Sequence, residues 1–242
     1  MFDHLKDTCL FYPCSGPDWL EPIQRFTPHI REFWFVDPDY FKNHRLSPNA
    51  TQSVSSGKYR PKALLRDHPE FTHIDSRIEG DLTAKEETRT NPKNGHQYPF
   101  YIPCTVAERY RDSKTGHEFI VHRHRGDGQH AIGRLTTPLG VFFHRGDNGP
   151  GGGEGASGAH WLSREWLTPV LDRLVDGGLI VTDGSCGIEY PELSKHHQSK
   201  LGEAAVEATV PFTDNDGRAF KCIGYAGERY GPTLIWQVNK PK

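Results

Sequence analysis

Two copies of the tetrapeptide His-Arg-Gly-Asp, at residues 124–127 and 144–147, stand at the ends of two expected strands. Imidazole and carboxylate groups can exchange protons near neutral pH, so His144 and Asp147 are candidate general bases. The functional interpretation places Arg145 and Asp147 beside a substrate at a common rim of a sheet. The alternative is a pair of similar turns with charged tips.

A glycine-rich stretch that reads NGPGGGEGASG covers residues 148–158 and precedes an expected helix. Backbone N–H groups of such a loop, including Gly153 and Glu154, could face an anion together with the helix dipole. The stretch lacks the GxxxxGK(S/T) pattern, so it is not a P-loop. A lid with glycine hinges and a plain disordered loop are the alternatives.

Histidines and cysteines could support two further kinds of chemistry, metal binding and nucleophilic attack. His122 and His124 would share one face of a strand, and residues 196–197 are adjacent histidines. None of them stands in an HExxH or CxxC context, so surface or structural roles are expected and no metal site is predicted. Cys14 follows the first strand and could be a nucleophile, but a small buried hydrophobic side chain is the favoured interpretation.

Alternating elements would position these residues. Residues 8–13 predict a short apolar strand, residues 19–26 a short helix, and residues 32–37 a strand that ends in an acid. This order is a βαβ unit, which builds parallel sheets. We expect further strands at 105–110, 118–123, 139–143, 179–182, 220–224 and 233–238, and helices at 129–135 and 161–175. Residues 41–99 are polar and predict an irregular insertion with one short strand around 71–74.

The turns that follow these strands form a recognisable series. A strand enters a glycine-containing turn at Tyr12-Pro13-Cys14-Ser15-Gly16, a second ends in an acid at Asp37, and a third closes with Gly126-Asp127-Gly128. A helix then meets a strand through the sequence LVDGGLIV at 174–181. In this order the chain resembles the class I S-adenosylmethionine-dependent methyltransferases. The resemblance implies one Rossmann-like α/β domain over 1–242, with a mixed, mostly parallel sheet and a C-terminal antiparallel β-hairpin.

The same resemblance implies a cofactor, S-adenosylmethionine, and assigns residues to it. Asp37 would accept hydrogen bonds from the ribose hydroxyls, and Asp127 would hold the adenine edge. The acceptor, whose identity stays open, would enter between the glycine-rich loop and the 41–99 insertion, and His144 or Asp147 could act as general base. The turn after the first strand would contact the cofactor through Tyr12, Cys14, Ser15, Gly16 and Asp18.

The amino-acid composition limits the classes of partner that the chain is expected to bind. The chain has 242 residues, with 29 basic and 31 acidic side chains, so no basic excess predicts a large nucleic-acid surface. Its odd number of cysteines, five, indicates a reducing cytoplasm. No apolar leader or membrane-spanning run is present in the sequence. The expected partner is a small molecule, and the oligomeric state stays open.

Two other functions remain open at this point. The chain could be a Rossmann-like protein without methyl transfer that binds a nucleotide or another small molecule, or serves as an interaction module. The short supply of glycine in the first turn favours that alternative. The chain could also be a metal-dependent hydrolase that uses its histidines and Asp147.

Overall fold

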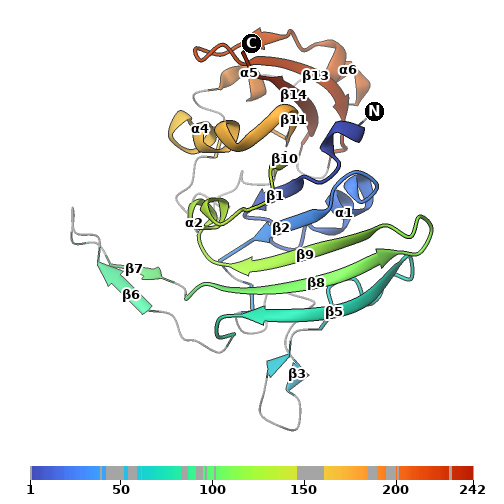
Figure 1. The fold of residues 1–242 in the computed structure, drawn as a ribbon. Helices are drawn as coiled ribbons and strands as arrows, with labels where there is room; N and C mark the ends of the chain where they lie inside the picture. The colour runs from blue at the N-terminus through green and yellow to red at the C-terminus, as the bar shows by residue number, and fades with distance from the viewer. Residues whose placement is uncertain are drawn as a thin grey trace.

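A ten-stranded mixed sheet organises the computed structural model of the chain (Figure 1). The structure describes residues 2–38, 40–41, 52–53, 59–60, 62–82, 87–90, 95, 97–100, 102–145, 161–184, 190–194, 200, 202–228 and 231–241. The predicted site residues Asp147, Gly153 and Glu154 lie outside these ranges, as do residues 196–197 and the whole glycine-rich stretch 148–158. Strand order across the sheet is β12-β13-β14-β11-β10-β1-β2-β9-β8-β5.

The centre of the sheet consists of parallel strands. Neighbouring strands pair in parallel from β9 through β2, β1 and β10 to β11. Their bounds are β1 Cys9–Pro13, β2 Glu32–Val36, β9 Glu118–Arg125, β10 Leu139–His144 and β11 Leu174–Thr182. Every residue of β1 and β10 is buried, which explains why these strands read as continuous apolar runs in the sequence.

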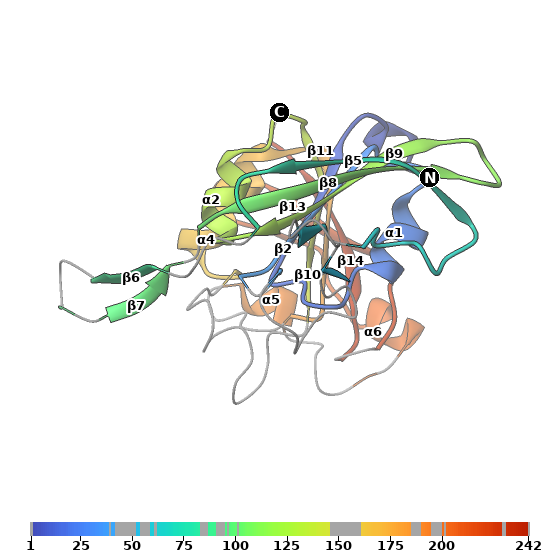
Figure 2. The same ribbon diagram turned by 90° about the horizontal axis from the view of Figure 1, so that it is seen from below.

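Antiparallel strands extend the sheet on both sides. Beside β9 lie β8 (Cys104–Asp112) and then β5 (Phe71–Glu79), which forms one edge. Beside β11 lie β14 (Leu234–Asn239), β13 (Ala219–Tyr225) and the short β12 (Phe212–Thr213). Two small hairpins, β3–β4 (Gln52–Ser53, Tyr59–Arg60) and β6–β7 (Glu87–Thr90, Gln97–Phe100), complete the strands. The β6–β7 hairpin projects away from the large sheet in both views (Figure 1, Figure 2).

Helices among the described residues are few and short. Their bounds are η1 Asp3–Leu5, α1 Leu20–Phe26, α2 Gly128–Gly133, α4 Arg164–Arg173, α5 Pro191–Ser194 and α6 Glu203–Glu207. Residues of α1 pack on one face of the sheet, whereas residues of α2, α4, α5 and α6 pack on the other. Within the part of the chain that the structure describes, no helix is both long and apolar enough to cross a membrane.

The prediction of a Rossmann-like, mostly parallel α/β fold is wrong. Among the described strands, seven pairings are antiparallel and four are parallel, so the sheet is not mostly parallel. The fold as a whole is mostly sheet. The longest described helix, α4, has ten residues. The sequence reasoning went wrong because it extended a parallel pattern, correct for the central strands, to a chain whose flanks pair antiparallel.

The 41–99 segment holds the largest local difference from expectation. Instead of one short strand around 71–74, it contributes the nine-residue edge strand β5. Seven consecutive β5 residues, 72–78, are exposed, which explains their polar sequence. The preceding turn is anchored to the sheet: the backbone N–H groups of Leu64 and Leu65 donate to Glu108 (3.1 Å) and to the Tyr110 hydroxyl (3.2 Å). Part of the segment is therefore built into the sheet.

Candidate functional site

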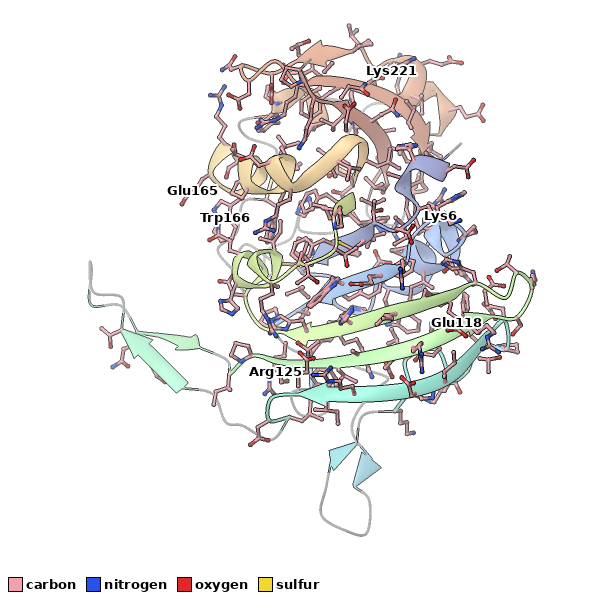
Figure 3. The ribbon with its side chains drawn as sticks, in the orientation of Figure 1. Lys6, Glu118, Arg125, Glu165, Trp166 and Lys221 are labelled. Carbon is pink, nitrogen blue, oxygen red and sulfur yellow. The ribbon has the colours of Figure 1, made fainter. Side chains whose placement is uncertain are left out.

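The carboxyl ends of the five parallel strands meet at one edge of the sheet. Because the strands run in the same direction, the residues that follow them emerge together. Figure 3 labels Glu118 and Arg125, which mark the two ends of β9, and the edge in question lies at the Arg125 end. The sequence-predicted site residues that the structure describes all lie at or just beyond such strand ends. The sheet therefore brings them to a common rim.

The turn after β1 has an unusual backbone. Cys14 has φ 53° and Gly16 has φ 49°, so two residues of a three-residue stretch adopt the left-handed conformation. Glycine adopts it at little cost, whereas cysteine does so only when its surroundings hold it there. The turn is fastened to β2 because the Ser15 N–H donates to the Val36 carbonyl at 3.1 Å.

Gly16 and Asp37 are in direct contact. The Gly16 N–H donates to Asp37 Oδ2 at 2.9 Å, which joins the turn after β1 to the acid after β2. A Cβ built on Gly16 would meet, among the described atoms, only that same carboxylate oxygen, at 3.8 Å. Both residues are partly exposed. The two residues that sequence reasoning placed closest to a ligand therefore stand side by side at an accessible point of the rim.

Tyr40 completes this corner and was missed in the sequence analysis. Its hydroxyl donates to the Gly16 carbonyl at 2.9 Å and contacts Ser15 Oγ at 2.7 Å. Burial, followed by the nearby charge of Asp37, raises the pKa of Tyr40, so the phenol stays protonated and keeps its role as a donor. The available signal was its position three residues after Asp37.

Tyr12, Asp18 and Arg145, all predicted to contact cofactor or substrate, are bonded to one another. The Arg145 guanidinium donates to both carboxylate oxygens of Asp18, at 2.5 and 2.9 Å, and to Glu21 at 2.5 Å. The Tyr12 hydroxyl donates to Asp18 at 2.9 Å and to the Arg145 carbonyl at 3.2 Å. Burial opposes the charge of Arg145, but its bonds to Asp18 and Glu21 outweigh burial and raise its pKa. This group ties the turn after β1 to the end of β10.

Asp127 has a local structural role in the described residues. It is the N-cap of α2, and its carboxylate accepts from the backbone N–H groups of Gln129 (2.6 Å) and His130 (3.3 Å). The helix packs tightly at its start, since a Cβ on Gly128 would lie 2.4 Å from the Trp161 ring. Its role at an adenine edge stays a prediction.

His144 ends β10 and is buried, with its ring parallel to that of Phe142 at 6.1 Å between centroids. Its cross-strand neighbour is Thr182 of β11. Cys14 packs against the core on the α4 side, consistent with a small hydrophobic side chain. The base role of His144 stays a prediction, and its predicted companion Asp147 lies outside the described residues.

The two histidines of β9, His122 and His124, have partners within the fold. His122 stacks on Trp34 at 4.1 Å between centroids and lies 3.6 Å from Glu32. The His122 imidazole, followed by the Thr137 hydroxyl, lowers the pKa of Glu32 to about 2 against the opposing effect of burial. His124 is bonded to the Thr105 hydroxyl at 2.8 Å. Among the described residues, no three His, Cys, Asp or Glu side chains are grouped so as to hold a metal ion.

Comparisons with known proteins identified no relative of this chain. The chain matches no protein-family model, no curated protein and no solved structure.

Proposed function

We propose that this protein binds S-adenosylmethionine at the carboxyl ends of β1 and β2 and transfers its methyl group to an acceptor. The observation that carries the proposal is the hydrogen bond from the Gly16 N–H to Asp37. It places a glycine backbone beside a carboxylate at the rim of a parallel strand pair. Ligands of sheets with parallel strands bind at this rim, next to the strand where the chain connections diverge.

The polar groups at this corner suit a nucleoside. A carboxylate at the tip of β2 can accept hydrogen bonds from two adjacent ribose hydroxyls, and charged acceptors make the stronger hydrogen bonds. Gly16 carries no side chain that would stand between the backbone and a ligand, and a Cβ there would have no described neighbour closer than 3.8 Å. The buried Arg145–Asp18 pair and the Tyr40 hydroxyl hold the turn in place before a ligand arrives.

The residues of this chain would act chiefly by positioning. S-adenosylmethionine supplies a methyl group already activated on a sulfonium sulfur. Such a transfer needs an acceptor held in line with the carbon–sulfur bond more than it needs acid–base chemistry. Where the acceptor carries a proton, His144 at the end of β10 is the described side chain that we assign as the base.

Calorimetric titration of the full chain with S-adenosylmethionine and S-adenosylhomocysteine tests the proposal. We expect micromolar binding of both, and a loss of roughly tenfold or more in Asp37→Asn, since one charge-assisted hydrogen bond is worth about 1.5–3 kcal/mol. Asparagine keeps an acceptor for the Gly16 N–H, so the turn should survive.

Asp112→Asn is the matched control. Asp112 also accepts backbone N–H groups, from Lys114 and Thr115, but it lies in the β8–β9 turn at the opposite end of β9. Its substitution should leave binding unchanged. If the wild type binds neither ligand at millimolar concentration, or if the two variants bind equally well, the proposal fails. Binding of adenine nucleotides in place of both ligands would instead favour a nucleotide-binding protein without methyl transfer.

A further inference from the structure

The edge strand β5 is long and exposed, and its pairing with β8 shifts register once, between His73 and Asp75. It is the last strand of the ten-stranded sheet and pairs with β8 on one side only among the described strands (Figure 1). The opposite edge of the sheet, β12, has two residues, whereas β5 has nine. A long edge strand offers a row of backbone donors and acceptors to another strand.

Apolar side chains are concentrated on the same strand. Among the described residues, three large hydrophobic side chains are exposed, and two of them, Ile74 (37 %) and Ile78 (41 %), belong to β5. Because side chains of a strand alternate between its faces, Ser76 and Ile78 lie on one face. Ile74 lies two residues before Ser76, at the register shift between His73 and Asp75. Asp75 and Arg77 lie on the other face, and Asp75 forms an ion pair with Arg109 of β8 there.

The order of these side chains is self-complementary. Residues 74–78 read Ile-Asp-Ser-Arg-Ile. If two copies pair antiparallel about a two-fold axis through Ser76, each Asp75 stands opposite Arg77 of the other copy. Each Ile74 then stands opposite Ile78 of the other copy. Opposite charges and apolar pairs directly across an antiparallel ladder both stabilise it.

We propose that two copies of this chain associate through β5 in this register and form a continuous sheet across a two-fold axis. Two-fold interfaces must be self-complementary, and the 74–78 sequence meets that condition on both faces at once. Arg77 is available for such a pair, because its side chain is 80 % exposed and its ion pair among the described residues is with Glu79 on its own strand. The ladder with β8 is regular from Asp75 to Glu79, which covers the Asp75–Arg77 core of the pairing, and its register shifts between His73 and Asp75, at Ile74.

Sedimentation equilibrium of the full chain at micromolar concentrations gives the first test. We expect a monomer–dimer equilibrium whose dissociation constant rises roughly tenfold or more in Arg77→Asp, since two attractive pairs become repulsive. Arg31→Asp is the control: Arg31 is also exposed and forms one surface ion pair, with Asp7, away from β5. A monomeric wild type, or equal dissociation constants for the two variants, would overturn the proposal.

A mixture of charge variants tests the register. Asp75→Arg and Arg77→Asp should each be monomeric alone, because like charges face one another across the axis. Mixed in equal amounts they should form heterodimers, in which both cross-axis pairs are again of opposite sign. Failure of the mixture to dimerise, when the wild type does, would show that β5 pairs in another register and would overturn the inference.

Cross-linking locates the two-fold axis. In this register Ser76 faces its own copy, with Cα atoms roughly 4.5–5.5 Å apart, within the range that a disulfide spans. Ser76→Cys should therefore form a covalent dimer under mild oxidation, whereas Thr72→Cys should not, because its two copies would lie about 26 Å apart along the strands. The wild type, with its own free cysteines, sets the background. Equal cross-linking of both variants would contradict the proposal.

Discussion

The buried charge of Arg145 stabilises the turn after β1. Its side chain and that of Asp18 are 0 % and 2 % exposed, so each charge relies on the other in place of water. A buried ion pair contributes little compared with an apolar pair of the same size, but the loss of one partner leaves an uncompensated charge. The turn that carries Gly16 therefore depends on a residue at the end of β10.

We predict that Arg145→Met destabilises the protein by about 3–5 kcal/mol, because it leaves Asp18 buried without its guanidinium partner. The measurement is urea unfolding followed by circular dichroism. Arg25→Met is the comparison, since Arg25 also contacts Glu21 but through a half-exposed pair of the kind worth about 0–1 kcal/mol. Similar losses in both variants would show that the Arg145 pair is not the stabilising contact described here.

Sequence reasoning reached the residues of the rim but not their mutual contacts. Strand-end patterns predicted Gly16 and Asp37, and the structure brings the two together. The bond between Asp18 and Arg145 joins residues 127 positions apart, and no local pattern encodes such a pairing. Arg145 was interpreted as a substrate residue, and the structure adds that its Nε and Nη2 atoms donate to Asp18 and Glu21. Tyr40 was given no role, because the Asp-Pro-Asp-Tyr stretch that contains it comes too soon after the first turn to match a methyltransferase motif.

At the scale of elements, α2 depends on how closely its first residue approaches its neighbours. Gly128 lies against the Trp161 ring and against Pro13 of β1. Any side chain there would push the start of α2 away from Pro13 and from Trp161, which lies three residues before α4. The last residue of the same helix, Gly133, has nothing described within 4 Å of an added Cβ.

These two glycines should respond in opposite directions to alanine. Gly128→Ala should cost about 1–3 kcal/mol through overpacking against Trp161 and Pro13. Gly133→Ala should stabilise by up to about 1 kcal/mol, because alanine restricts the unfolded chain without a clash. Thermal unfolding of both variants beside the wild type decides the matter. A neutral Gly128→Ala would mean that the Trp161 ring can move away freely.

The element that sequence reasoning described worst is β5. A strand is recognised in a sequence by alternation of apolar and polar residues, and that alternation requires one buried face. Residues 72–78 are exposed on both faces, so their composition is that of a loop. The β8–β9 hairpin was predicted because it has a buried face: Val106, Tyr110, Phe119 and Val121 all belong to the core.

At the scale of the whole molecule, the central strands were easier to anticipate than the fold class. Parallel strands buried on both faces, such as β1 and β10, leave a clear apolar signal, and both were expected. The flanking strands turn the molecule into a mostly antiparallel sheet, and that property depends on which edges pair across long stretches of sequence. The helices are short, so their apolar periodicity was too weak to correct the predicted fold class.

Global stability should depend on pH through His124. Burial, followed by the nearby charges of Arg134, His130, His122 and Arg125, lowers the pKa of His124 to about 4 from 6.5. Between these values the unfolded chain takes up the proton first. The contribution is therefore fully present above pH 6.5 and is lost as pH falls toward 4.

Replacement of His124 by Asn should flatten that part of the stability profile. The amide can still bond the Thr105 hydroxyl, and the fall in unfolding free energy between pH 7 and 4.5 should shrink by up to about 3 kcal/mol. His73→Asn, at an exposed position on β5, should leave this part of the profile unchanged. Denaturant titrations across the pH range provide the measurement. Parallel profiles for His124→Asn and the wild type would exclude this assignment.

The bond between Arg145 and Asp18 also constrains the order in which the chain can fold. Synthesis from the N-terminus releases β1 and its turn long before Arg145, which follows Asp18 by 127 residues. Until β10 joins β1, the Asp18 carboxylate has no guanidinium to hold it, and closing so long a loop carries a large entropic penalty. The turn that carries Gly16 is thus fully held only once β10 has joined β1. Nascent or truncated chains that stop before β10 should lack an ordered turn between β1 and α1, so this corner of the fold forms only after most of the chain has been made.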